Sequence, residues 1–324
     1  MQELCQALRA IIHSMILVTG GTGFIGQALI QYLVDAGHQV RTLIRPSPRS
    51  PRLPLGVPVE VAVASLLDER GLRAAMIGVD VVYHLAGVER RGAKADLMET
   101  DIQGTQSVVR AAQDADVKRI FYISHLGADR ASAYPVLKAK AIAKEYIRRS
   151  GIDFTIMRTA MVFGPGDGFT TGLAQLLKAL PIGILLPGDG DVQIQPLWVN
   201  DLVTCLVWGL DDDDTRNKIF DLGGPEYLSF REIVEIIKLE LDIQRTMIPV
   251  SPPYLRAMTV FFEYLLPRPP VSVYWLDYFA TNRTCALDTI PRVFNLMPAR
   301  FSQRLDFLQA QNWRRVFWRS VMGR

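Results

Sequence analysis

A run of glycines near the start of the chain constrains its fold more than any other feature of the sequence. The β-branched segment Met15–Thr19 reads as a buried strand, and Phe24–Ala36 has apolar residues at helical spacing. Between them stands Gly20-Gly21-Thr22-Gly23, and Gly26 follows inside the helix. Glycines at this spacing let the chain turn tightly, let backbone amides approach a pyrophosphate and let helix and strand pack closely. We therefore predict a dinucleotide-binding loop; the alternative is a tight turn without a ligand.

Short β-branched runs continue to alternate with longer amphipathic stretches over residues 15–160, a pattern typical of βαβ units and a parallel sheet. Strands are predicted at Met15–Thr19, Gln39–Ile44, Val57–Val63, Val79–Leu85, Arg119–Ser124 and Phe154–Met157. The fold class expected is α/β, with a Rossmann doubly wound parallel sheet.

After about residue 160, glycine and proline recur in the sequence, as in Gly164-Pro165-Gly166 and Pro187-Gly188. This texture indicates a second, smaller lobe. The predicted organisation is an appendage at 1–14, a Rossmann domain at 15–164 plus 201–222, a substrate or partner lobe at 165–200 plus 223–300, and a basic amphipathic terminal helix at 301–324.

The terminal stretch 302–324 combines arginines with aromatic residues at helical spacing. Three placements stay open: docking on the chain's own core, contact with a protein partner, or peripheral contact with an anionic membrane surface. A contact surface would leave Trp313, Phe317 and Trp318 exposed, whereas docking would bury them.

Composition excludes several classes of protein. With 49% hydrophobic and 21% charged residues, the chain has ample core material and is not of a disordered class. Its cysteines, Cys5, Cys205 and Cys285, lack CxxC spacing, so neither a disulfide framework nor a metal site is expected. A net charge of only +3 and the lack of a nucleic-acid-binding motif argue against a nucleic-acid-binding protein. We expect a cytoplasmic protein, with a position at the inner face of the membrane as the alternative.

Arg45 follows the second predicted strand, at the position where NAD-binding chains usually carry an acidic residue for the ribose hydroxyls. A guanidinium fits a 2′-phosphate bidentately. The sequence therefore predicts NADP(H) in preference to NAD(H), unless Arg45 is simply a solvated loop residue.

Several motifs in chain order carry a family resemblance. After the glycine loop come Asp80-Val81-Val82-Tyr83-His84-Leu85-Ala86-Gly87, Gly104-Thr105, Tyr134-Pro135-Val136-Leu137-Lys138, Arg158-Thr159-Ala160-Met161-Val162-Phe163-Gly164-Pro165, Gln195-Pro196-Leu197-Trp198-Val199-Asn200-Asp201 and Asp221-Leu222-Gly223-Gly224-Pro225-Glu226. Together they resemble the extended or atypical short-chain dehydrogenases/reductases, which include NAD-dependent epimerases and dehydratases. Within these, the chain resembles the branch that contains the nucleotide-binding accessory subunit of respiratory complex I and its bacterial relatives.

The resemblance assigns roles to individual residues. The expected cofactor-binding residues are Gly20, Thr22, Gly23, Phe24, Ile25, Gly26, Arg45, Leu85, Ala86, Gly87, Tyr134 and Lys138. In this assignment Leu85-Ala86-Gly87 flanks the adenosine half, and Tyr134 and Lys138 flank the nicotinamide ribose.

The chain also departs from the family pattern. Ala64-Ser65-Leu66 replaces a frequent Gly-Asp-Leu, Asp101 replaces an asparagine, and Ser124-His125 stands where relatives often have two serines. The first departure removes an acid that in relatives commonly meets the adenine amine, and the last places a histidine where the catalytic serine usually stands.

The candidate catalytic residues are Tyr134, Lys138, Ser124 and His125. A phenol beside an ammonium can donate a proton to a carbonyl as hydride arrives from a nicotinamide. Ser124 or His125 would orient the substrate; the alternatives are a strand-end serine and a loop histidine.

Two functions remain open. One is an NADPH-dependent oxidoreductase, epimerase or dehydratase acting on a small carbonyl or sugar-like substrate. The other is a non-catalytic NADPH-binding structural subunit or assembly factor of a respiratory or other membrane-associated complex.

Overall fold

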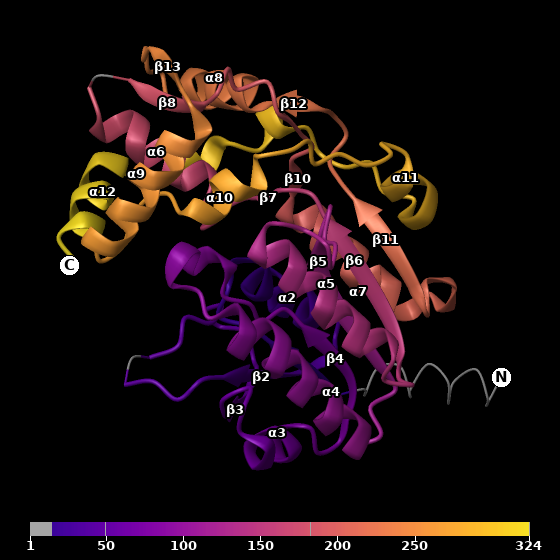
Figure 1. Cartoon of the computed structure of the whole chain (residues 1–324). Helices are drawn as coiled ribbons and strands as arrows, with labels where there is room; N and C mark the ends of the chain where they lie inside the picture. Colours follow the sequence, from indigo (N-terminus) through magenta and orange to yellow (C-terminus); the bar gives the residue numbers. More distant parts are fainter. Residues whose placement is uncertain (1–14, 49, 182, 324) are drawn as a thin grey trace. The chain divides into compact units, whose positions relative to one another are not determined.

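The computed structural model describes residues 15–48, 50–181 and 183–323, and they form two compact units (Figure 1). Unit 1 comprises the described residues up to Gly87, Asp96–Arg158 and Leu202–Phe220. Unit 2 comprises Val88–Ala95, Thr159–Asp201 and Asp221–Arg324. These boundaries differ from those expected from the sequence. Residues 88–95 belong to unit 2, although they lie between two segments of unit 1.

A seven-stranded sheet forms the centre of unit 1, in the order β11-β6-β5-β4-β1-β2-β3. Its strands are β1 (Met15–Thr19), β2 (Gln39–Ile44), β3 (Glu60–Val63), β4 (Val79–His84), β5 (Arg119–His125), β6 (Asp153–Thr159) and β11 (Lys218–Leu222). The strands from β3 to β5 pair in parallel. The chain moves from β1 outward to β3 and then returns to the other side of β1, so β1 and β4 flank a topological switch point. The predicted Rossmann fold class is confirmed.

Two strands are shorter than predicted: β4 ends at His84 rather than at Leu85, and β3 starts later. β3 begins at Glu60 rather than at Val57, because Pro58 has no amide hydrogen for the ladder and the preceding proline-rich segment runs as a loop.

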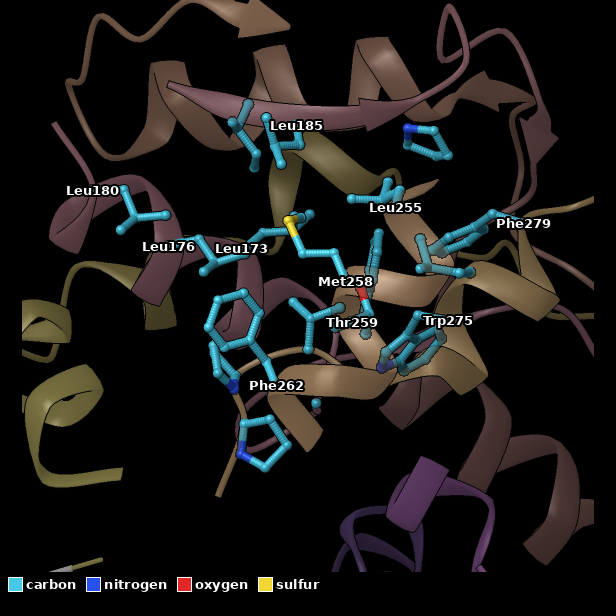
Figure 2. Close-up of a pocket in the computed structure, with 18 of the residues that line it drawn as sticks. Leu173, Leu176, Leu180, Leu185, Leu255, Met258, Thr259, Phe262, Trp275 and Phe279 are labelled. Atoms are coloured by element: carbon cyan, nitrogen blue, oxygen red, sulfur yellow. The ribbon is translucent and has the colours of Figure 1, made fainter. Parts of the chain in front are cut away.

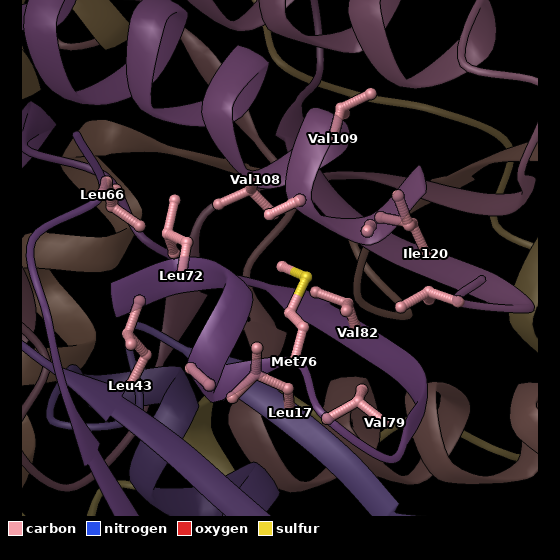
Figure 3. Close-up of a cluster of buried hydrophobic side chains, with 14 of the residues drawn as sticks. Leu17, Leu43, Leu66, Leu72, Met76, Val79, Val82, Val108, Val109 and Ile120 are labelled. Atoms are coloured by element: carbon pink, nitrogen blue, oxygen red, sulfur yellow. The ribbon is translucent and has the colours of Figure 1, made fainter. Parts of the chain in front are cut away.

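An apolar core fills one face of the sheet (Figure 3). The helices that contribute to it are α3 (Glu69–Ala75), α4 (Gly104–Asp114) and α5 (Pro135–Arg148), which contact one another in that order. Leu17 of β1 and Val82 of β4 meet Leu72 of α3 and Val108 of α4 there. A one-turn π-helix, η2 (Met98–Gln103), leads into α4.

Strand residues whose side chains point away from this core pack on the other face of the sheet. Tyr83 stacks on Phe121, with ring centroids 4.5 Å apart, and its hydroxyl donates a hydrogen bond of 2.9 Å to the Leu206 carbonyl. Leu206 belongs to α7 (Val199–Asp211), and α2 (Phe24–Asp35) contacts β1 and β2. Helices therefore cover both faces of the sheet of unit 1, as expected of a doubly wound fold.

Unit 2 is built from helices and three two-stranded sheets. The strands are β7 (Val162–Phe163) with β10 (Leu197–Trp198), β8 (Ile184–Pro187) with β13 (Met247–Val250), and β9 (Gln193–Ile194) with β12 (Leu228–Ser229). The helices are α6 (Thr170–Ala179), α8 (Phe230–Glu240), α9 (Pro252–Leu265), α10 (Val273–Tyr278), α11 (Thr289–Phe294) and α12 (Trp313–Val321). Ser229 and Glu232 form the capping box that the sequence indicates at the start of α8.

The terminal helix is shorter than predicted. It spans only Trp313–Val321, because Asn312 caps it by accepting the Arg315 amide, while Leu305 and Leu308 are buried in short turns before it. Trp313 and Phe317 are 5% and 9% exposed, and α12 contacts α6 of the same unit. Of these three aromatics only Trp318 is substantially exposed, so the helix docks on its own lobe, which is one of the placements that the sequence left open.

The structure also bears on membrane insertion. Over the ranges that the structure covers, every helix is too short or too polar to span a bilayer.

Candidate dinucleotide-binding site

The glycine loop joins β1 to α2, and its glycines have different steric surroundings. Gly20 has a φ of +75°, and a Cβ there would lie 2.7 Å from the Leu85 carbonyl carbon at the end of β4. A Cβ on Gly26 would collide with the Gly20 carbonyl. Gly20 and Gly26 are therefore required by the fold itself, because backbone occupies the space that a side chain would need.

Gly23 is different. Its backbone is extended, with φ −79° and ψ 171°, and a Cβ there would meet only the Gly20 carbonyl oxygen, at 3.1 Å. A side chain at Gly23 would therefore meet less backbone than one at Gly20 or Gly26.

The N-terminus of α2 suits an anion. Gly23 is its N-cap, no side chain caps it, and its first turn carries no acidic residue. Exposed Thr22 and half-buried Phe24 and Ile25 flank this position. Unfilled amide donors and the helix dipole together favour a phosphate group here.

Arg45 lies directly after β2, next to β1 in the sheet, and its side chain is exposed. Since β1 and β2 run parallel, their carboxyl ends lie at the same sheet edge, which places Arg45 on the side of the glycine loop. Arg52 is also exposed, and Arg49 lies outside the described residues.

A chain of hydrogen bonds ties the end of β1 to the end of β4. His84 contacts the Thr19 hydroxyl through Nδ1 at 2.7 Å and the Thr105 hydroxyl through Nε2 at 2.9 Å. Thr105 donates its own proton to the Asp101 carbonyl, at 2.6 Å, so it accepts from His84 Nε2–H. Nδ1 must then accept from Thr19, whose oxygen faces the Ala86 amide at 3.4 Å.

This arrangement needs a neutral imidazole. Burial, with a further contribution from the nearby charge of Lys140, lowers the pKa of His84 to about 3. The neutral tautomer that the network specifies is thus maintained at physiological pH. It anchors Leu85, Ala86 and Gly87, whose segment follows β4 at the same sheet edge as the glycine loop; Leu85 and Ala86 are half-buried and Gly87 is exposed.

A buried ion pair lies beside this network. Lys140 Nζ is 3.0 Å from Asp101 Oδ1, with the side chains 5% and 0% exposed. The pair connects η2 to α5, the helix that follows the candidate catalytic tyrosine. An asparagine at position 101 would leave the buried ammonium without a countercharge. The sequence analysis did not identify Lys140 as a buried residue. Its position among the apolar residues of α5 could have indicated the burial.

The spacing of four residues suggests that Tyr134 and Lys138 lie in one helix. In the structure, however, Tyr134 lies just before α5. It is the N-cap of α5, with an extended backbone, because Pro135 occupies the first helical position. Its carbonyl nevertheless accepts the Lys138 amide at 3.1 Å, so Lys138 is one turn away. The Tyr134 side chain is half-buried and that of Lys138 is exposed.

Ser124 and His125 end β5 in different environments. Ser124 is fully buried and His125 is half-buried. Successive strand residues point to opposite faces, so Ser124 shares the face of Tyr122, whose ring lies 5.8 Å from Lys140 Nζ. His125 points to the other face, and the two side chains do not form one joint orienting group.

An open helix N-terminus, a glycine that leaves room for phosphate and parallel strands diverging at a switch point define a dinucleotide-binding domain. Residues 20–175 match the family described as NAD(P)H-binding.

The chain is also similar in sequence to several curated proteins. The chain is 28% identical over 279 residues to NADH dehydrogenase [ubiquinone] 1 alpha subcomplex subunit 9, mitochondrial, of Arabidopsis thaliana, covering 84% of this chain and 69% of that protein. The mouse protein of the same name is 27% identical, with 73% and 63% covered. A ceramide reductase of Caulobacter vibrioides is 29% identical over 52% of this chain and 53% of its own length.

Solved structures share the fold. UDP-glucose 4-epimerase of Thermotoga maritima superposes with a TM-score of 0.70 at 18% identity, covering 95% of this chain and 99% of that one. A NADPH-dependent quinone oxidoreductase of Escherichia coli gives 0.69 at 17% identity, covering 91% and 99%. The predicted resemblance to the complex I accessory subunit is confirmed by these relatives, and the solved structures confirm the fold.

Proposed function

We propose that the chain binds NADP(H) and uses it as an oxidoreductase or epimerase/dehydratase on a small carbonyl or sugar-like substrate. The observation that carries the proposal is the half-buried Tyr134, which ends the loop after β5 at the sheet edge that carries the glycine loop and Arg45. At that edge a bound nicotinamide supplies hydride chemistry.

The chain's own residues would have separate tasks in this proposal. The α2 N-terminus and Gly23 hold the pyrophosphate, and Arg45 holds the 2′-phosphate. Lys138 hydrogen-bonds the ribose, and the Tyr134 hydroxyl donates or accepts the substrate proton. With Ser124 buried and His125 on the opposite face, orientation of the substrate falls mainly on Tyr134.

The experiment is NADPH oxidation against a panel of small aldehydes, ketones and quinones. Tyr134→Phe should lower the rate on any accepted substrate by roughly a hundredfold or more, the usual contribution of a general acid. NADPH affinity should stay nearly unchanged, because the phenolic proton is needed only in the reaction. Unchanged turnover in Tyr134→Phe contradicts the catalytic role.

A second candidate is a non-catalytic NADPH-binding subunit or assembly factor. The similarity to the Arabidopsis subunit over 84% of this chain supports it, and so does the burial of Ser124. In this case no carbonyl would be turned over, yet NADPH would raise the melting temperature, because a ligand that binds only the folded state stabilises it. Contact with a protein complex or a membrane surface belongs to this second candidate.

A further inference from the structure

Unit 2 contains an apolar cavity of about 300 Å³ that the proposed chemistry does not use (Figure 2). Its wall comes from α6, α9, α10 and the segments around them. No charged side chain lines it, and the lining side chains that carry a polar group are Thr259 and Trp275. Such a wall offers dispersion contacts and almost no partners for hydroxyl or phosphate groups.

The cavity has a buried floor and an exposed mouth. Leu173, Ile184 and Phe279 at the floor are 4%, 3% and 2% exposed. Leu180 and Phe262 at the mouth are 39% and 42% exposed. Large apolar side chains left in water around a concave apolar space are typical of a ligand site rather than of a packing defect.

A cation stands at one side of the mouth. Arg245 Nε donates a hydrogen bond of 3.0 Å to the carbonyl of Leu180, and the side chain is only partly exposed. Among the residues that the structure describes, no carboxylate lies within ion-pair distance of Arg245. Lys178, on the last turn of α6, donates to the Leu241 carbonyl at 2.9 Å. The mouth near Leu180 is therefore positively charged beside an apolar interior.

We propose that this cavity binds the hydrocarbon chain of an anionic amphiphile, with the chain against the floor and the head group beside Arg245. Its 300 Å³ lies at the lower end of the range of small-molecule pockets, which suits a medium-length acyl or isoprenoid chain. Met258 in the wall adds an adaptable surface for chains of different shape. The inference concerns unit 2 alone and does not rest on hydride transfer.

The test measures displacement of the fluorescent probe N-phenyl-1-naphthylamine by dodecanoate and by dodecanol, both below their micelle or solubility limits. The wild-type chain should bind the probe saturably and dodecanoate should displace it, more tightly than dodecanol does. Leu173→Trp should weaken dodecanoate on the order of tenfold or more, because the indole fills the floor and removes the apolar area buried on binding. Arg245→Gln should weaken dodecanoate and leave dodecanol unchanged.

Leu239→Trp is the matched control, because Leu239 on α8 is 74% exposed and does not line the cavity. If Leu173→Trp fails to fold, Met258→Glu at the 38% exposed mouth position places a repelling charge there instead. A wild-type chain without saturable binding would overturn the proposal, as would variants that bind dodecanoate like the control. Equal affinities for dodecanoate and dodecanol would overturn the anionic head. NADPH affinity measured on the same variants should not change, so failure here is distinguishable from failure of the proposed function.

Discussion

The Lys140 ammonium lies 3.0 Å from the Asp101 carboxylate in a place where both side chains are almost fully buried. Removing one partner of such a pair leaves an uncompensated charge in a medium of low dielectric constant. Lys140→Met should therefore lower the free energy of unfolding by about 3–5 kcal/mol, measured by urea denaturation.

The double variant Asp101→Leu/Lys140→Met provides the control for that prediction. It removes both charges and should recover most of the loss, because well-packed apolar residues can replace a buried pair. Additive losses in the double variant would contradict a direct interaction between Asp101 and Lys140.

His84 should make the stability of the fold depend on pH. Its pKa in the folded chain is about 3, below the ordinary value of 6.5. Its contribution to stability is therefore complete above pH 6.5 and is lost as the pH falls from 6.5 toward 3, because only the unfolded chain takes up the proton. Between pH 6.5 and 5 the loss should reach about 1.6 kcal/mol, because the slope approaches roughly 1.4 kcal/mol per pH unit only once the unfolded histidine is mostly protonated.

The measurement is the free energy of unfolding as a function of pH for the wild type and His84→Gln. The variant should show a flatter slope over this interval, whatever its absolute stability. Since burial also lowers the pKa of His38, some slope remains in His84→Gln and His38→Gln serves as the comparison. Equal slopes in the wild type and His84→Gln would argue against a neutral, buried His84.

Gly23 and Gly26 separate ligand binding from folding. Gly23→Ala should fold, since its backbone is extended and the nearest obstacle is one carbonyl oxygen at 3.1 Å. Its dissociation constant for NADPH should nevertheless rise on the order of tenfold or more, which corresponds to about 1.4 kcal/mol. Isothermal titration calorimetry measures the affinity, and the melting temperature reports the fold.

Gly26→Ala should behave in the opposite way and lower the melting temperature before any ligand is added, because its methyl group collides with the Gly20 carbonyl. Unchanged NADPH affinity in a folded Gly23→Ala would contradict the assignment of the phosphate position.

The part of the site that the sequence predicts well is local. The glycine loop, the ends of β1 and β2 and the exposed position of Arg45 follow from short stretches whose residue types have few conformational alternatives. Contacts between segments that are distant in the sequence could not be predicted in this way. Asp101 looked like a departure from a family pattern, and only the packing of η2 against α5 reveals Lys140 as its partner.

The C-terminal region shows another limit of prediction from local sequence. Apolar periodicity suggested one helix over 302–324, but Leu305 and Leu308 fill the core from turns, and the cap at Asn312 delays the helix to Trp313. Periodicity cannot distinguish a helix from a series of turns that bury the same residues. The cavity of unit 2 was equally out of reach, because segments far apart in the sequence line it.

The central claim is that the glycine loop and Arg45 together bind NADP(H), and paired titrations of NADPH and NADH test it most directly. The wild type should bind NADPH more tightly. Arg45→Ala should weaken NADPH roughly tenfold to a hundredfold, the range for hydrogen bonds to a charged group, and leave NADH unchanged. Arg52→Ala, at another exposed arginine, is the matched control and should have a smaller effect. Equal affinities for the two cofactors in the wild type, or an unchanged preference in Arg45→Ala, would contradict the account.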